Sequence, residues 1–250
     1  MIIKVGTCGI RQPRRRYYDN LDVVELQETF YDMPNPDRLR ELRKEAPQNF
    51  EFTIKVFQAL THSPRSPTWK RMKYKLKGDL EKYGLLKPTK ENFELWEEFL
   101  NNVKPLEAKV FIFQTPPSLP ATEESCRWII EFFNTIKRGD IIIGWEPRGD
   151  FYNKIELLKK IFDKCEIVHV VDPFRRLPVK RQEVNYFRLH GIGPGEVNYR
   201  YKYTDDDLRK LLEICNNCDG SLVYVLFNNV YMFDDATRFR NLAKSSNLVR

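Results

Sequence analysis

Residues 109–146 read KVFIFQTPPSLPATEESCRWIIEFFNTIKRGDIIIGWE, and this stretch decides the fold class. It begins with a short apolar run at 109–115 and ends with a second one at 140–146. Between them apolar residues recur at helical spacing over 123–136, and Thr122 followed by acidic residues is a typical helix start. Apolar strands that alternate with such helices predict βα units and a parallel sheet.

The same alternation extends in both directions along the chain. Eight apolar runs are predicted to be strands: 2–9, 23–30, 50–57, 109–115, 140–146, 166–172, 184–190 and 221–228. Helices are predicted at 37–45, 90–102, 123–136, 154–163, 205–215 and 234–244. Eight strands in 250 residues predict a (β/α)8 TIM-type barrel that forms one domain over residues 1–250. The connections 11–22 and 173–183 are too short for a full helix with loops, so we expect an irregular barrel after strands one and six.

An open, doubly wound sheet is the alternative arrangement of these elements. Such a sheet usually carries a Gly-x-Gly-x-x-Gly turn after its first strand, and residues 6–9 (GTCG) do not complete that spacing. No run approaches the roughly 20 apolar residues of a membrane span, and the N-terminal residues are typical of a strand and not of a signal peptide. We therefore expect a cytoplasmic protein without a membrane partner.

The five cysteines do not suggest a disulfide framework. Cys215 and Cys218 form a lone Cys-x-x-Cys motif, and no second pair completes a four-thiolate zinc site. The motif is either a redox pair or the end of a helix that turns through Asp219 and Gly220.

Polar residues stand at the ends of most predicted strands, and in a (β/α)8 barrel the C-terminal strand ends form the active site. They are Thr7, Glu25, Thr29, Lys55, Gln114, Glu146, Arg148, Asp172, Arg188, His190, Asn228 and Asn229. One buried charge can belong to a structural ion pair, but unpaired buried charges are costly. Several strands that end in this way predict a clustered functional site.

Lys55 interrupts an otherwise apolar run. Burial lowers the pKa of a lysine and makes its amine a nucleophile able to form a Schiff base; the alternative is an ion pair with Glu25 or Glu146. Glu25, Glu146 and Asp172 are candidates for acid–base catalysis, and with His190 they could also bind a divalent metal. Amine catalysis requires no cofactor, and the three histidines lack paired spacing, so we assign no metal ligands.

Arg188 and His190 are two residues apart and therefore share one face of a strand. Arginine there suits a phosphate or a carboxylate, through two parallel hydrogen bonds. Asn228 and Asn229 fall on opposite faces, so at most one of them points inward from a regular strand.

A set of short motifs carries a family resemblance. In order, they are VGTCG at 5–9, VELQETFY at 24–31, FTIK at 52–55 followed by Thr61-His62, FQTPP at 113–117, WEPR at 145–148, VD at 171–172, YFRLHG at 186–191 and FNN at 227–229. The set resembles the family called domain of unknown function 72, or YecE-like, over residues 2–244. The resemblance implies a TIM-type barrel and, by position, the site residues Glu25, Thr29, Tyr31, Lys55, His62, Gln114, Glu146, Arg148, Asp172, Arg188, His190 and Asn228. The sequence departs from the family at Cys8, where serine is usual, and at Ile10, where an aromatic residue is common, so a first-loop hydroxyl is not carried over.

The net charge of +7 is unevenly distributed. Residues 11–16, 63–77, 174–181 and 192–202, called the basic loops below, contain 16 Lys and Arg but one acidic residue, Glu196. Each follows a predicted strand, and one-signed loops at the catalytic end of a barrel suit a polyanion. The candidate phosphate contacts are Arg14, Arg15, Arg16, Lys70, Arg71, Arg175 and Arg176. Aromatic residues in or beside the loops are expected to be exposed and to stack on bases: Tyr17, Tyr18, Trp69, Tyr74, Phe174, Tyr199, Tyr201 and Tyr203.

The favoured function is a nucleic-acid enzyme of DNA repair, either a glycosylase and abasic-site lyase or an endonuclease on damaged bases. Lys55 would attack the sugar C1′ atom, Glu146 or Asp172 would transfer protons, and Arg188 with His190 would hold the adjacent phosphate. The alternative is an aldolase, isomerase or hydrolase acting on a sugar or phosphorylated metabolite, with or without a divalent ion. A non-catalytic RNA- or DNA-binding barrel is the second alternative. The sequence predicts no oligomeric state.

Overall fold

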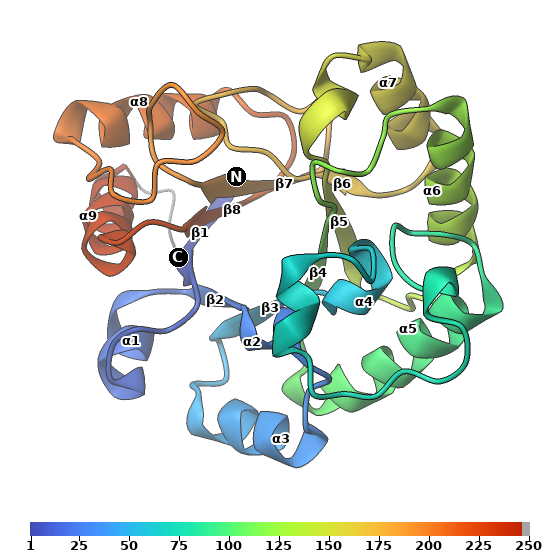
Figure 1. Ribbon diagram of the computed structural model, residues 1–250. Helices are drawn as coiled ribbons and strands as arrows, with labels where there is room; N and C mark the ends of the chain where they lie inside the picture. Colours follow the sequence, from blue (N-terminus) through green and yellow to red (C-terminus); the bar gives the residue numbers. More distant parts are fainter. Residues whose placement is uncertain (247–250) are drawn as a thin grey trace. The chain divides into compact units, whose positions relative to one another are not determined.

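The computed structural model describes residues 1–246 (Figure 1). Its eight strands are β1 (Ile2–Cys8), β2 (Val23–Leu26), β3 (Glu51–Lys55), β4 (Val110–Gln114), β5 (Ile142–Glu146), β6 (Val168–His169), β7 (Val184–Leu189) and β8 (Leu222–Phe227). They hydrogen-bond in the order β6–β5–β4–β3–β2–β1–β8–β7, and the neighbours β1–β2, β1–β8, β3–β4, β4–β5 and β7–β8 run parallel. A parallel bridge joins Val171 to Phe187 of β7. The predicted (β/α)8 barrel fold is confirmed.

Helices connect most of these strands. The α-helices in the described residues are α1 (Arg14–Asn20), α2 (Glu28–Tyr31), α3 (Pro36–Glu45), α4 (Gln58–Thr61), α5 (Lys90–Val103), α6 (Glu123–Thr135), α7 (Ile155–Lys164), α8 (Asp205–Asn216) and α9 (Met232–Ser245). Short 3-10 helices are η1 (Pro67–Arg71), η2 (Leu80–Lys82), η3 (Lys104–Leu106) and η4 (Gly149–Tyr152). The six predicted helices are confirmed to within two residues at either end. Within residues 1–246, no helix has the length and apolar character needed to cross a bilayer.

The predicted irregularities are present. The connection 173–183 between β6 and β7 contains no helix, and the connection after β1 contains only the seven-residue helix α1. All eight predicted strands were longer than the observed ones, the second and the sixth by the most. The second strand ends at Leu26 instead of residue 30, because the Thr29 hydroxyl bonds to the Leu26 and Lys55 carbonyls (3.1 and 2.8 Å) and the chain turns into α2. The sixth strand is reduced to Val168–His169.

The contacts of the chain group it into two compact units. Unit 1 consists of residues 1–25, 46–51 and 168 onward, and unit 2 consists of residues 26–45 and 52–167. Unit 1 therefore joins the two ends of the sequence, as the blue strand β1 and the red helix α9 illustrate (Figure 1).

The core of unit 1 depends on close strand packing and on one buried tyrosine. A side chain on Gly6 of β1 would put its Cβ 1.9 Å from the Val23 carbonyl oxygen, so only glycine permits this approach to β2. Tyr17 of α1 is 1 % exposed. Its hydroxyl accepts the Thr7 N–H (3.0 Å) and donates to the Val23 carbonyl (3.0 Å), which fixes α1 against β1 and β2.

We expect Tyr17→Phe to lower the free energy of unfolding by about 1–3 kcal/mol, because it leaves two buried backbone groups without this partner. Urea unfolding measures the change. Tyr231→Phe, which alters an exposed phenol, is the matched control and should stay within about 0.5 kcal/mol of the wild type. Equal effects of the two substitutions would contradict this role of Tyr17.

The core of unit 2 is largely aromatic. The Trp96 ring of α5 lies 5.3 Å from that of Phe113 on β4, and its indole N–H donates to the Lys137 carbonyl (2.7 Å). Trp145 of β5 donates to the Thr115 hydroxyl (3.2 Å). The indoles of Trp96 and Trp145 thus have the hydrogen-bond partners that buried tryptophans require.

Candidate functional site

Strands β3, β4 and β5 of unit 2 place polar side chains on one face of the sheet. Lys55 is the Cα partner of Ile112, Ile112 is the partner of Gly144, and Gln114 is the partner of Glu146. Because side chains alternate along a strand, Lys55, Gln114 and Glu146 project to the same face. Gly144 shares the row of Lys55 and contributes no side chain to it.

The opposite face of these strands is covered by helices. The Phe113 ring lies 5.9 Å from Phe132 of α6, and the Trp145 ring lies 5.4 Å from Phe162 of α7. The face that carries Lys55 is therefore the one that points to the interior in a (β/α)8 barrel.

Lys55, the last residue of β3, is 9 % exposed and lies against an aromatic ring. Its Nζ is 3.9 Å from the centroid of Phe30, a distance at which a charged ammonium is attracted to the ring face. The Thr29 hydroxyl bonds to the Lys55 carbonyl (2.8 Å), so Thr29 positions the backbone of the lysine.

His62 completes this cluster and is held uncharged. Its ring lies 5.0 Å from the Phe30 ring, and its Nδ1 is 2.8 Å from the Thr61 hydroxyl. Burial, and secondarily the charge of Lys55, lowers the pKa of His62 to about 3. A neutral imidazole therefore lies close to the amine at physiological pH.

This shift makes stability pH-dependent. The folded protein resists protonation of His62 while the unfolded chain accepts a proton near pH 6.5, so stability is lost as the pH falls from about 6.5 towards 3. Between pH 7 and pH 5 the loss from His62 is expected to be about 2 kcal/mol. Urea unfolding at both pH values should show this loss in the wild type and not in His62→Gln. An identical pH dependence in the two proteins would contradict the assignment.

Glu146, the last residue of β5, forms a direct ion pair with Arg148, two residues further on. Both side chains are almost fully buried, and Gln114 lies in register beside Glu146. The strand end thus presents a carboxylate, a guanidinium and an amide.

Most cations of the basic loop in unit 2, residues 63–77, are solvent-exposed, and they include Lys70 and Arg71. The Arg71 guanidinium lies 3.9 Å above the Tyr31 ring, and the Tyr31 carbonyl accepts a hydrogen bond from Gln58 (2.9 Å). Tyr31 therefore fixes one end of a loop whose remaining charges face water.

In unit 1 the predicted residues Glu25 and Arg188 form a buried ion pair. The Arg188 Nη2 donates to Glu25 Oε1 (2.9 Å), and the Tyr186 hydroxyl donates to Oε2 (2.9 Å). Glu25 and Tyr186 are 0 % exposed and Arg188 is 1 % exposed. Cys8, whose thiol stands where the family has a hydroxyl, is the Cα partner of Glu25 and is buried.

Asp172 and His190 lie together in unit 1. The Asp172 carboxylate accepts the backbone N–H groups of His190 (2.9 Å) and Phe174 (3.1 Å). Its Oδ2 is 3.8 Å from His190 Nδ1 and 3.9 Å from Arg175 Nε. Arg175 also donates to the Gly191 carbonyl (2.8 Å), so Asp172 and Arg175 organise the loops that follow β6 and β7.

At the end of β8 the two asparagines differ. Asn228 is half-buried and its backbone N–H donates to the Leu189 carbonyl (2.8 Å). Asn229 is buried and its side-chain amide donates to the Tyr201 carbonyl and to Asp235, both at 2.7 Å. Burial raises the pKa of Asp235. Asn229 thus holds the basic loop 192–202 to α9.

The basic loops of unit 1 are less uniformly positive than their sequence indicates. Arg176 forms a two-bond ion pair with Glu196 (2.6 and 3.0 Å), whereas Arg14, Arg15 and Arg16 at the start of α1 are exposed. The prediction of exposed aromatic residues was wrong for Tyr17 and Tyr203, each 1 % exposed, because their hydroxyls bond to backbone groups inside the unit. It is confirmed for Tyr199, which is 48 % exposed.

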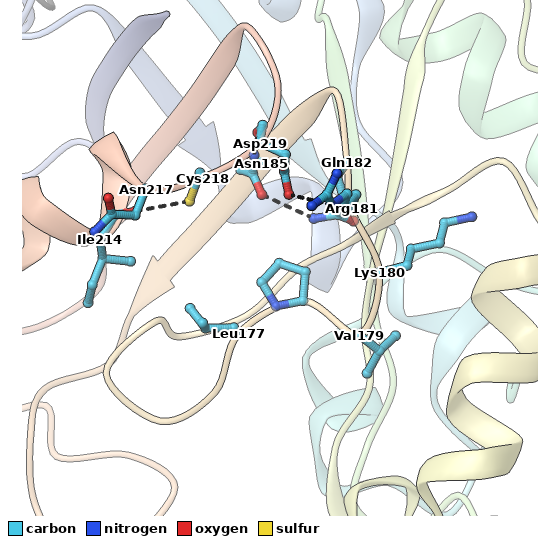
Figure 2. A pocket seen from close by; sticks show the side chains of 11 residues that line it. Leu177, Val179, Lys180, Arg181, Gln182, Asn185, Ile214, Asn217, Cys218 and Asp219 are labelled. Carbon is cyan, nitrogen blue, oxygen red and sulfur yellow. Dashed lines mark hydrogen bonds and ion pairs between the residues drawn. The ribbon is translucent and has the colours of Figure 1, made fainter.

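A cavity of about 490 Å3 lies at the other end of strands β7 and β8, where they begin (Figure 2). Cys218 and Asn217 line it opposite Leu177 and Lys180. The five cysteines, all within the described residues, form no disulfide, and burial raises the pKa of the Cys218 thiol. The Cys-x-x-Cys motif is the end of α8, followed by a left-handed turn at Gly220 (φ 94°).

No group of three or more His, Cys, Asp and Glu side chains within residues 1–246 is arranged to hold a metal ion. Sequence reasoning also missed three members of these clusters: Phe30 under Lys55, Tyr186 on Glu25, and Gly144 in the row of Lys55. Two of the three could have been found from the sequence. The two-residue strand period places Tyr186 on the same face as Arg188, and a single glycine within a strand, such as Gly144, signals a close approach of another part of the molecule. Phe30 was hidden inside the overextended second strand.

A (β/α)8 barrel with charged residues at its strand ends is the class of protein that these observations define. A family model described as "Protein of unknown function DUF72" matches residues 8–249, and the chain belongs to this family. None of the curated proteins compared with the chain matches it.

Solved structures agree on the fold. A DUF72 family protein from Enterococcus faecalis is 21% identical, with 100% of this chain and 97% of that chain covered and a TM-score of 0.75. Another from Thermotoga maritima is 20% identical, with 98% and 100% covered and a TM-score of 0.71. A D-psicose 3-epimerase is 10% identical, with 92% and 91% covered and a TM-score of 0.55. At these identities the likeness shows the fold alone.

Proposed function

We propose that this chain is a DNA-repair enzyme whose Lys55 amine forms an imine with the sugar of a damaged or abasic nucleotide. The observation that carries the proposal is the position of Lys55 at the carboxyl end of β3, against Phe30 and close to a neutral His62. Glu146 projects from the same face of the sheet. Imine formation requires an amine nucleophile and a group that transfers protons, and Lys55 and Glu146 supply these two groups on one face of the sheet.

At an abasic site the reaction uses groups of the chain and water. The Lys55 ammonium first gives up a proton to the solvent, and its amine then attacks the C1′ aldehyde carbon of the ring-opened sugar. The carbonyl oxygen takes up one proton from the nitrogen and one from the solvent and leaves as water, which gives a protonated imine. Glu146 then accepts a proton from C2′, which breaks the C3′–O bond and releases the 3′ phosphate with its strand. Water hydrolyses the imine and regenerates the amine. For a nucleotide that retains its damaged base, attack at C1′ first displaces the base.

Cations of the same unit are suited to hold the DNA backbone. Arg148 is paired with Glu146 and suits a phosphate oxygen beside the reacting sugar. The exposed cations of loop 63–77 suit phosphates further along the strand. The predicted catalytic roles of Asp172 and His190, and the phosphate-binding role of Arg188, stay predictions.

Borohydride trapping tests the proposal. The protein is incubated with labelled duplex oligonucleotides that carry an abasic, deaminated or oxidised nucleotide, and borohydride reduces any imine to a stable amine. We expect a covalent adduct and strand cleavage on at least one of these duplexes and on no undamaged one. Absence of both on every duplex would refute the proposal.

Gly144 favours a second candidate, an enzyme that forms an imine with a small sugar or phosphorylated carbonyl metabolite. Gly144 contributes no side chain to the row of Lys55, and this suits a compact substrate better than a large one. Borohydride inactivation that depends on a sugar phosphate, and not on DNA, would support this candidate. Binding of nucleic acid without any turnover would instead indicate a non-catalytic protein.

A further inference from the structure

A hollow of about 370 Å3 lies in unit 1 between the segment after β1 and the start of α9. The residues that line it are Gln12, Arg16 and Asn20 from the first segment and Val230, Tyr231, Phe233, Asp234 and Thr237 from the second. Its volume falls within the range of small-ligand sites in proteins. Both walls come from unit 1, so the hollow is complete within it.

The lining of the hollow is mixed, and two of its exposed side chains are apolar or aromatic. Val230 and Tyr231, the two residues before α9, are 55 % and 43 % exposed. The Val230 backbone N–H donates to the Tyr199 carbonyl (2.7 Å), and Tyr199 is itself exposed. Neighbouring apolar side chains left in water are a more informative sign of a binding surface than a single one.

Cations flank the aromatic rings of the hollow. Lys202 Nζ lies 5.5 Å from the centroid of Tyr231, and the Arg16 guanidinium lies 5.3 Å from that of Phe233. Asp234 is paired with Lys202 (3.2 Å), so these two charges largely offset each other and the net positive charge beside the hollow comes from the arginines of α1. Helix α1 begins with three exposed arginines and has no acidic residue in its first turn. An aromatic face between cations is the arrangement that binds an unstacked base and its phosphates.

We infer that this hollow binds one unstacked base of a single-stranded DNA segment on the ring of Tyr231, while Arg14, Arg15 and Arg16 hold the adjacent phosphates. The inference rests on the proposed function, because it takes DNA as the substrate. It deepens that function by assigning to unit 1 a base-binding site that does not depend on Lys55.

Fluorescence anisotropy tests the inference with two labelled oligonucleotides of equal length and charge, an oligothymidylate and a strand of abasic tetrahydrofuran units. The wild type is expected to prefer the oligothymidylate. Tyr231→Ala should weaken its binding by about 5- to 100-fold and leave the affinity for the abasic strand unchanged. Leu177→Ala removes another exposed apolar side chain of unit 1 and should change neither affinity. Replacing Arg14, Arg15 and Arg16 by Gln should weaken both oligonucleotides and reduce the salt dependence.

Equal affinity of the wild type for the two strands would overturn the inference, as would equal weakening of both by Tyr231→Ala. Thermal unfolding of each variant shows that a loss of binding is not a loss of folding. Borohydride trapping is a separate readout. Trapping without a base preference would refute this inference alone, whereas a base preference without trapping would refute the proposed function alone.

Discussion

Lys55→Ala is expected to abolish the borohydride-trapped adduct, a loss of at least about 100-fold, because the variant lacks the only atom that becomes bonded to C1′. Lys55→Arg should lose the adduct equally. A guanidinium keeps a positive charge near Phe30 but does not lose its proton at accessible pH, so it does not form the imine. The two variants together separate a nucleophile from a residue that only supplies charge.

The control for this experiment is Lys109→Ala. Lys109 is exposed and precedes β4, at the opposite end of that strand from Gln114, so its removal should leave trapping unchanged. Full trapping by Lys55→Ala would mean that a different amine reacts. Loss of trapping with Lys55→Ala but not with Lys55→Arg would assign Lys55 an electrostatic role.

Arg188→Met is expected to lower the free energy of unfolding by about 3–5 kcal/mol, because it leaves the Glu25 carboxylate buried without its guanidinium. In the double variant Glu25→Leu/Arg188→Met no uncompensated charge remains, and most of the lost stability should return. Urea unfolding of the three proteins measures both changes. A loss below about 1 kcal/mol in Arg188→Met would show that Glu25 finds another partner or water.

The same unfolding curves address domain organisation. We propose that residues 1–250 fold as one domain, in which case fluorescence and circular dichroism should follow one coincident transition. Separate transitions for the two probes would indicate that units 1 and 2 unfold independently.

Most strands could be predicted because each is an apolar run bounded by turn residues. The limits of β4, β5, β7 and β8 depend on local patterning that the sequence contains. The end of β2 does not depend on local patterning. Thr29 and Phe30 favour a strand locally, but their contacts with Lys55 of β3 place them in α2. Tertiary contact overrides β propensity at this point.

The candidate site was predictable in its residue types and less so in its partners. The two-residue strand period places Lys55, Gln114 and Glu146 on one face, and this required only the positions of the strands. The pairing of Arg176 with Glu196 joins two separate loops, so no local pattern records it. The excess of 15 positive charges on the basic loops already counts Glu196, but Lys202 and Arg181 also pair with acidic residues outside the loops, Asp234 (3.2 Å) and Asp219 (3.4 Å), so the excess overstates the charge available to a ligand.

Unit 1 is built from segments that are far apart in the sequence, and this affects how it folds during synthesis. Strand β1 pairs with β8 over Ile2–Thr7 and Leu222–Phe227, so β1 has no partner on that edge until β8 has been synthesised. At about 5–20 residues per second, the roughly 200 intervening residues take on the order of 10–40 s to synthesise. Throughout that interval one edge of an apolar strand is open to other nascent chains. We therefore expect the yield of folded protein to depend on the speed of elongation as well as on the stability of the finished molecule.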